Sequence, residues 1–198
     1  EITTRLVGSE MCIRDSLETL GKSFIDNRNM TIFILVMLVT GTLERSGLKE
    51  AAAALIGKVK GASASVVIAA YGVMRAIFGA FNVGFGGVAG FVRPVIMPMV
   101  TAAIENKEGE INEEHEEQAK GMAAGMENIM WFFFQVLFIG GSGGLLVQGT
   151  LAGLGYDVSL VDLAKVEVPV AVFALIITIV YYFLKDKQLS KKYYGKEK

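Results

Sequence analysis

Residues 71–94, YGVMRAIFGAFNVGFGGVAGFVRP, decide how the rest of this chain is interpreted. The segment sets two arginines, Arg75 and Arg93, among apolar and glycine residues. Soluble domains seldom bury arginine in such surroundings. Membrane proteins do so where they handle an anion or line a water-filled cavity. The segment therefore favours a membrane protein that carries a small anionic solute.

The composition agrees with a membrane protein and excludes several other classes. Hydrophobic residues make up 53% of the 198 residues, and the mean hydropathy is +0.48. A net charge of −1 indicates no nucleic-acid partner. The single cysteine, Cys12, allows neither an intrachain disulfide nor a cysteine-based metal site. The single histidine, His115, lies among glutamates, which argues against a histidine metal site or catalytic triad. We expect no cofactor and no metal.

Residues 1–16 resemble the translation of a transposase-type sequencing-library adapter. We therefore expect them to be an artefact and exclude them from fold reasoning. The alternative is a genuine polar N-terminal arm. Residues 17–198 are expected to form a single polytopic membrane domain.

The apolar runs predict an all-α membrane protein with about five membrane-embedded helical segments. The expected segments are 30–43, 62–81, 84–104, 121–138 and 158–184. Amphipathic residues 17–29 and the lysine-bearing stretch 48–61 are expected to lie at the membrane surface. Whether 84–104 crosses the membrane or turns back as a re-entrant hairpin stays open.

Two glycine-rich clusters interrupt the predicted helices. The first contains Gly84, Gly86, Gly87 and Gly90, and the second contains Gly140, Gly141, Gly143 and Gly144. Unwound backbone at membrane depth is tolerated only inside protein or beside water, and paired interruptions are typical of transporter binding sites. Close helix packing at small-residue spacing is the alternative explanation.

The loop charges predict an orientation. With five crossings, loop 44–61, polar loop 105–120 and the basic tail 185–198 share one side and carry most of the lysines and arginines. The positive-inside rule then places the tail in the cytoplasm of a bacterial inner-membrane protein. Trp131 is expected to be an aromatic anchor at the membrane surface.

Six polar side chains are candidates for substrate binding. They are Arg75, Arg93, Asn82, Asn128, Gln135 and Ser142. A guanidinium matches a carboxylate, and backbone N–H groups at broken helix ends assist an anion. We expect both guanidinium groups and the unwound backbone to face one shared pocket. The alternatives are a surface position for Arg93, an ion pair between Arg75 and Glu127, and interhelical hydrogen bonds for the amides.

From about Leu17 onward, three segments resemble a known family. They are residues 27–30, 43–56 (LERSGLKEAAAALI) and 91–99 (FVRPVIMPM). They are similar to the smaller membrane subunit of the bacterial two-subunit 5-oxoproline (pyroglutamate) transporter, which is related to the ion-transporter superfamily. The resemblance implies a larger membrane subunit as partner, 5-oxoproline as substrate, re-entrant or broken helices, and coupling to a cation or proton.

A structural or assembly subunit without substrate contact is the competing hypothesis. The small-residue packing spacing and the short first span support it. No nucleophile–base pair or paired catalytic aspartates occur in the predicted spans, so we expect no enzyme.

Overall fold

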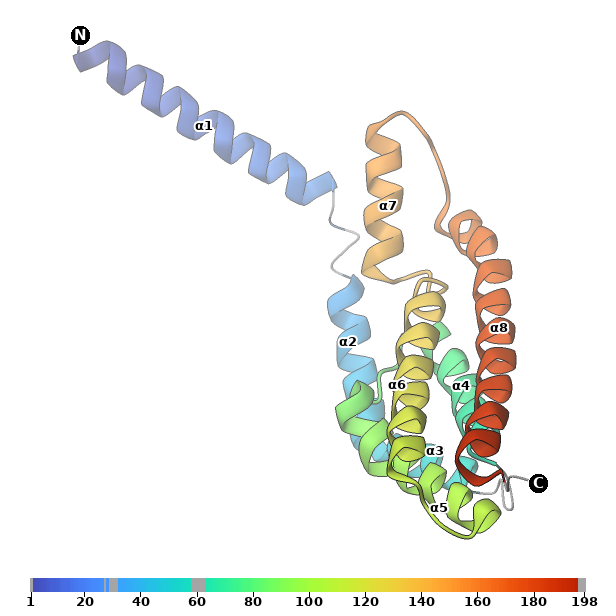
Figure 1. Ribbon diagram of the computed structural model, residues 1–198. Coiled ribbons are helices and arrows are strands. Elements are labelled where there is room, and N and C mark those ends of the chain that lie inside the picture. The colour runs from blue at the N-terminus through green and yellow to red at the C-terminus, as the bar shows by residue number, and fades with distance from the viewer. Residues whose placement is uncertain (1, 27, 29–31, 58–62, 196–198) are drawn as a thin grey trace.

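The computed structural model describes residues 2–26, 28, 32–57 and 63–195, and within them the chain is helical without any strand. This agrees with the predicted all-α class. The elements in chain order are α1 (Ile2–Asp26), α2 (Ile32–Leu43), η2 (Glu44–Leu48), α3 (Lys49–Ile56), α4 (Ala64–Ala80), η3 (Val88–Ile96), α5 (Met97–Glu108), α6 (Glu113–Gln135), α7 (Ser142–Gly153) and α8 (Leu160–Tyr194). Figure 1 shows α1 projecting away from the other helices.

Helices α4, α6 and α8 pack together as the core of the molecule (Figure 1). The buried side chains between them are mainly apolar, including Ile68, Met126 and Met130. Glycines allow close approach at two points: Gly72 lies against Met126, and Gly125 lies against the Tyr182 hydroxyl of α8. Close packing of the kind considered from the sequence is therefore present at these two points.

Capping residues set where the core helices begin. The Asn112 side chain accepts hydrogen bonds from the backbone of Glu114 and His115 at the start of α6. At α4, the cap comes from another helix, because Asp186 of α8 accepts a hydrogen bond from the backbone N–H of Ser65. The first turns of α4 and α6 and the last turns of α8 therefore meet at one end of the bundle.

Two helical stretches are long and apolar enough to cross a membrane. They are Val88–Glu108, formed by η3 and α5, and Leu160–Tyr194, which is α8. Helix α8 has 35 residues and thus extends about 50 Å, more than the ~30 Å hydrocarbon layer. Only 11% of its most apolar window is buried inside the protein. This is compatible with a membrane protein.

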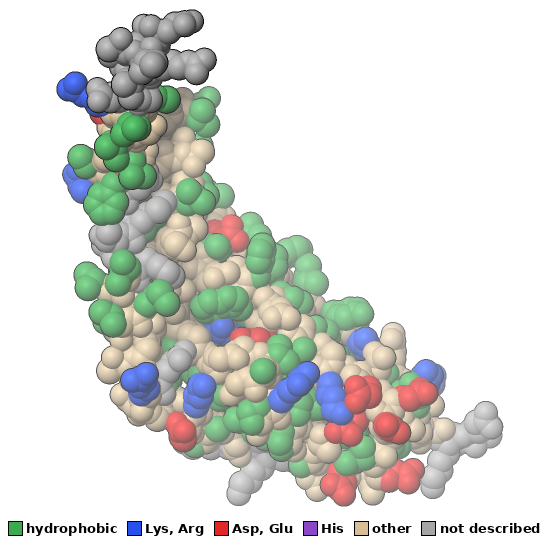
Figure 2. All heavy atoms as spheres, turned by 90° about the vertical axis from the view of Figure 1, so that its left-hand side faces the viewer, with side chains coloured by type: hydrophobic (Ala, Val, Ile, Leu, Met, Phe, Trp, Pro, Cys, Tyr) green, Lys and Arg blue, Asp and Glu red, His purple; other side chains and the backbone are tan. Residues whose placement is uncertain are grey.

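Within the described residues, the other expected spans (30–43, 62–81 and 121–138) do not form helices that are both long and apolar enough to cross a membrane. Helices α2 and α4 have 12 and 17 residues, and α6 begins with a strongly acidic turn. Figure 2 shows hydrophobic side chains over the upper and middle parts of one face, with most Lys, Arg, Asp and Glu gathered below them. The upper and middle parts of this face therefore suit an apolar environment, and the lower part suits water.

The chain leaves helical geometry at both glycine clusters. After α4, residues 81–87 form a turn and an extended segment before η3 begins. Positive φ angles occur there at Asn82 (56°), Gly86 (81°) and Gly87 (65°). After α6, residues 136–141 form the second interruption. Gly90 lies inside η3, and Gly143 and Gly144 lie in the first turn of α7. Pro94 lies within η3.

Candidate functional site

A cavity of about 440 Å³ lies where the two interruptions of the helices meet. Three different parts of the chain line it: α2, the turn after α4, and the region from the end of α6 to the start of α7. The lining residues are Met37, Thr40, Asn82, Trp131, Gln135, Val136, Gly141, Ser142, Gly143 and Gly144. We call it the break cavity. It brings together three predicted binding residues (Asn82, Gln135 and Ser142) and three glycines of the second cluster (Gly141, Gly143 and Gly144).

The local backbone explains how the polar groups reach the break cavity. Asn82 adopts a left-handed conformation, which asparagine tolerates better than most residues, directly after α4 ends. Gln135 is the last residue of α6. Both side chains are half-buried, so each amide lies at the edge of the protein interior. The cavity therefore offers two groups that can each donate and accept hydrogen bonds.

The start of α7 gives the break cavity its partial positive charge. Ser142 is the first residue of this 12-residue helix, and no side chain caps its N-terminus. The first N–H groups of a helix lack partners within the helix and carry part of its dipole. Gly143 and Gly144 have no side chains of their own to cover these N–H groups. The wall formed by α7 can therefore attract an anion.

Arg75 lies behind Trp131, buried and paired. Its guanidinium carbon lies 4.3 Å from the ring centre of Trp131, and Trp131 lines the break cavity. Arg75 Nε donates to Glu127 Oε2 at 2.7 Å, and one terminal nitrogen donates to the Val83 carbonyl at 3.1 Å. Tyr71 donates its hydroxyl to the same Glu127 oxygen. The ion pair with Glu127, which the sequence left as an alternative, is thus present.

The two arginines do not share one cavity, contrary to the expected arrangement. Arg75 is 1% exposed and held by Glu127, whereas Arg93 is exposed and lines a different hollow with Glu117 and Lys120. The reason is the helix face that each residue occupies: Arg75 lies on the face of α4 that packs against α6, whereas Arg93 lies on the exposed side of η3. Asn128 is exposed and is not among the residues of the break cavity.

Sequence reasoning missed part of the lining. Trp131 was expected at the membrane surface, yet it stands four residues before Gln135 and so shares its helix face, a spacing that could have revealed it. Met37 and Thr40 come from α2, far away in the sequence. No local pattern in α2 marks these two positions, because its apolar residues run without a clear period.

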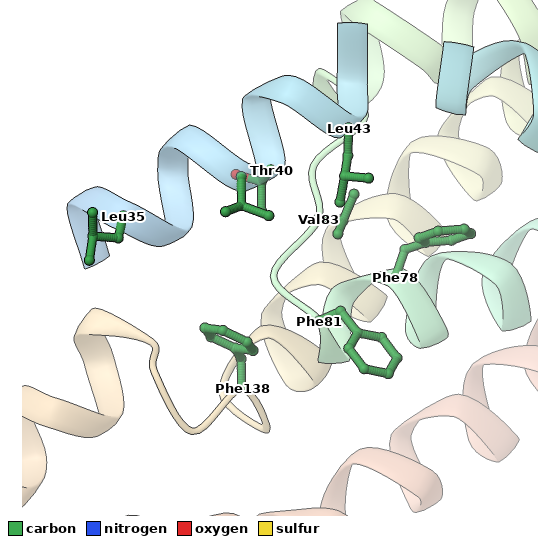
Figure 3. Close-up of a pocket in the computed structure, with 8 residues that line it drawn as sticks. Leu35, Thr40, Leu43, Phe78, Phe81, Val83 and Phe138 are labelled. Atoms are coloured by element: carbon green, nitrogen blue, oxygen red, sulfur yellow. The ribbon is translucent and has the colours of Figure 1, made fainter. Parts of the chain in front are cut away.

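An apolar cavity of about 470 Å³ adjoins the break cavity. Figure 3 shows Leu35, Thr40 and Leu43 on α2 facing Phe78 and Phe81 at the end of α4, with Val83 on the extended segment and Phe138 on the second interruption. Thr40 belongs to both cavities. Helix α2 therefore forms one wall of a polar and an apolar space.

The break cavity offers groups that can bind a small solute. Within the described part of the chain, no three His, Cys, Asp or Glu side chains come close enough together to hold a metal ion. The lining offers amides, a hydroxyl, helix N–H groups and an indole. These groups can hold a small solute with one anionic and one amide-like end.

Comparisons with known proteins identify the family and little beyond it. No curated protein and no solved structure matches the chain. One family matches over residues 1–190, nearly the whole chain, and its description is "Protein of unknown function (DUF969)". The chain belongs to this family.

Proposed function

We propose that this chain is a subunit of a secondary transporter for a small carboxylate, and that the break cavity is its substrate site. The single observation that carries the proposal is the meeting of two interrupted helices around one polar cavity. Transporters commonly bind substrate at such interruptions, where freed helix ends face the solute. The volume of about 440 Å³ is within the range of small-molecule sites.

The lining favours a solute with a carboxylate and an amide. The carboxylate would lie at the N-terminus of α7, near Ser142, where N–H groups are free to donate. Asn82 and Gln135 would complement an amide or lactam, since each can donate and accept. The sequence resemblance suggests 5-oxoproline, which has one carboxylate and one lactam. Arg75 would act behind Trp131 by fixing the indole rather than by touching the solute.

In this proposal the chain is a multi-pass protein of the bacterial inner membrane, with its tail in the cytoplasm. It pairs with the larger membrane subunit and couples uptake to a cation or proton. The exposed apolar side chains of α8, among them Phe173, Ile177 and Leu184, supply a surface for lipid or for that partner.

The test compares two amides on the same helix. Uptake of radiolabelled 5-oxoproline is measured in cells that make both subunits, with Gln135→Ala and Asn128→Ala as a matched pair. Because only Gln135 lines the cavity, its loss should raise the half-saturating concentration about 2- to 12-fold, the equivalent of one neutral hydrogen bond. Asn128→Ala should leave uptake unchanged. Equal uptake by both variants and the wild type at equal membrane levels would refute the assignment.

A purely structural subunit is the second candidate, because Gly72 and Gly125 show close packing in the core. A photoreactive substrate analogue separates the two functions. Labelling of the segment 131–144 supports substrate binding, whereas labelling confined to the larger subunit supports a structural role.

A further inference from the structure

A second hollow, of about 660 Å³, lies along the first half of α6, whereas the break cavity lies at the end of α6, and the two share no residue. It is formed between η3, the start of α5 and the first half of α6. Its lining residues are Val88, Val92, Arg93, Met97, Glu117, Lys120, Gly121 and Ala124. We call it the Arg93 hollow. The substrate proposed above does not account for it.

Arg93 and Lys120 are the two cations that line the Arg93 hollow, and they differ in whether a carboxylate lies within ion-pair distance in the described part of the chain. Lys120 is paired, because its Nζ lies 2.6 Å from Glu117 Oε1 and 3.7 Å from Glu116 Oε1. Arg93 forms no hydrogen bond or ion pair with any residue in the described part of the chain. A further cation, Lys49 Nζ, lies beside the backbone of Gly86 and Gly90, one turn before Arg93. The hollow therefore favours an anionic group next to Arg93.

The rest of the Arg93 hollow is apolar and open. Val92 and Met97 are buried side chains that form its floor. Gly121 faces empty space, since a methyl group placed there would meet no atom within 4 Å. A free inorganic anion gains nothing from such a floor, whereas an amphiphile can lay a hydrocarbon chain on it.

One face of the molecule has the two zones that a lipid needs (Figure 2). On the face in Figure 2, Lys and Arg side chains lie along the lower border of the region dominated by hydrophobic side chains. Basic pockets between helices at this level of a membrane protein suit anionic headgroups. Arginine also matches a phosphate through two parallel hydrogen bonds.

We propose that the Arg93 hollow binds an anionic phospholipid, with Arg93 on the headgroup phosphate and an acyl chain along Val92 and Met97. The site rests on the chain lying in a membrane but not on substrate transport. Membrane fractionation tests whether the chain lies in a membrane. An uptake assay tests substrate transport alone, so a negative result there does not refute the lipid site. The two proposals can therefore fail separately.

The experiment measures lipid bound to the purified full chain in mild detergent by native mass spectrometry, with phosphatidylglycerol as probe. Arg93→Gln should bind it about tenfold more weakly, as expected for loss of a charge-assisted contact. Arg93→Lys should recover part of the binding. The control Lys187→Gln removes an equal charge from an exposed position of α8 outside the hollow and should bind like the wild type.

Three results would overturn the proposal. The first is equal phosphatidylglycerol binding by Arg93→Gln and the wild type. The second is equal binding of zwitterionic phosphatidylcholine, which would remove the role of charge. The third is competition by inorganic phosphate at the same concentration as the lipid, which would make the hollow a free-anion site. Gly121→Leu, which fills the open space without altering charge, should also weaken lipid binding and serves if Arg93→Gln misfolds.

Discussion

Replacing Glu127 by Gln should destabilise the protein strongly, because it leaves the Arg75 cation buried without its anion. The two side chains are 2% and 4% exposed, so water cannot replace the lost carboxylate. Breaking a buried ion pair from one side costs about 3–5 kcal/mol. For a chain of this size, each kcal/mol lowers the melting temperature by about 2–4 °C, so the expected drop is about 6–20 °C.

The assay is thermal unfolding in mild detergent, followed by tryptophan fluorescence. Trp131 is the chain's single tryptophan and stacks on Arg75, so its emission reports on this pair directly. Glu117→Gln is the matched control, since Glu117 is an exposed acid on the same helix and should cost less than about 0.5 kcal/mol.

A second variant separates charge from packing. Changing Arg75 and Glu127 together to Met removes both buried charges while keeping bulk, so it should recover much of the lost stability. A melting temperature of Glu127→Gln within about 2 °C of the wild type would show that the buried ion pair does not stabilise the fold. A double variant that melts as low as Glu127→Gln would show that the loss does not come from an unpaired buried charge.

Three further predictions concern other parts of the bundle. Burial lowers the pKa of His115, although the nearby Asp186 carboxylate acts to raise it. The folded protein should therefore lose stability as the pH falls below about 6.5. A pKa of His115 above that value, measured by NMR, would contradict this. Asn82→Val should cost about 1–2 kcal/mol in chemical unfolding because of its left-handed backbone, whereas Asn82→Gly should be near neutral, and equal costs would refute the conformational explanation. Gly125→Leu should lower the free energy of unfolding by about 1–3 kcal/mol, because the larger side chain overpacks against Tyr182. An unchanged unfolding midpoint would show that α8 moves to make room without loss of stability.

Residue type and spacing predicted much of the fold. The predicted segment 62–81 matches α4 within two residues, whereas α6 begins eight residues before the predicted 121–138 and α8 ends ten residues after the predicted 158–184. The glycine clusters coincide with both interruptions. Sequence patterns could not tell which segments cross a membrane. That depends on packing partners, and α6 combines an acidic start with a buried apolar stripe.

The candidate site was predictable in part. Asn82, Gln135 and Ser142 are predicted to bind substrate because an amide or lactam needs donors and acceptors, and the structure brings them to one cavity; Asn128, predicted with them, lies outside it. The positions of the arginines were not predictable in the same way. Arg75 and Arg93 look alike in sequence, but Arg75 lies on the buried face of α4 against Glu127, and Arg93 lies on the exposed side of η3.

The lysine-rich C-terminal stretch looks dispensable by composition, yet Asp186 within it holds the first turn of α4, more than a hundred residues earlier. Trimming the chain just after the last apolar turn of α8 would therefore leave Ser65 without its acceptor and His115 without its neighbouring carboxylate. Affinity tags and reporter fusions belong after residue 195, where α8 has already ended.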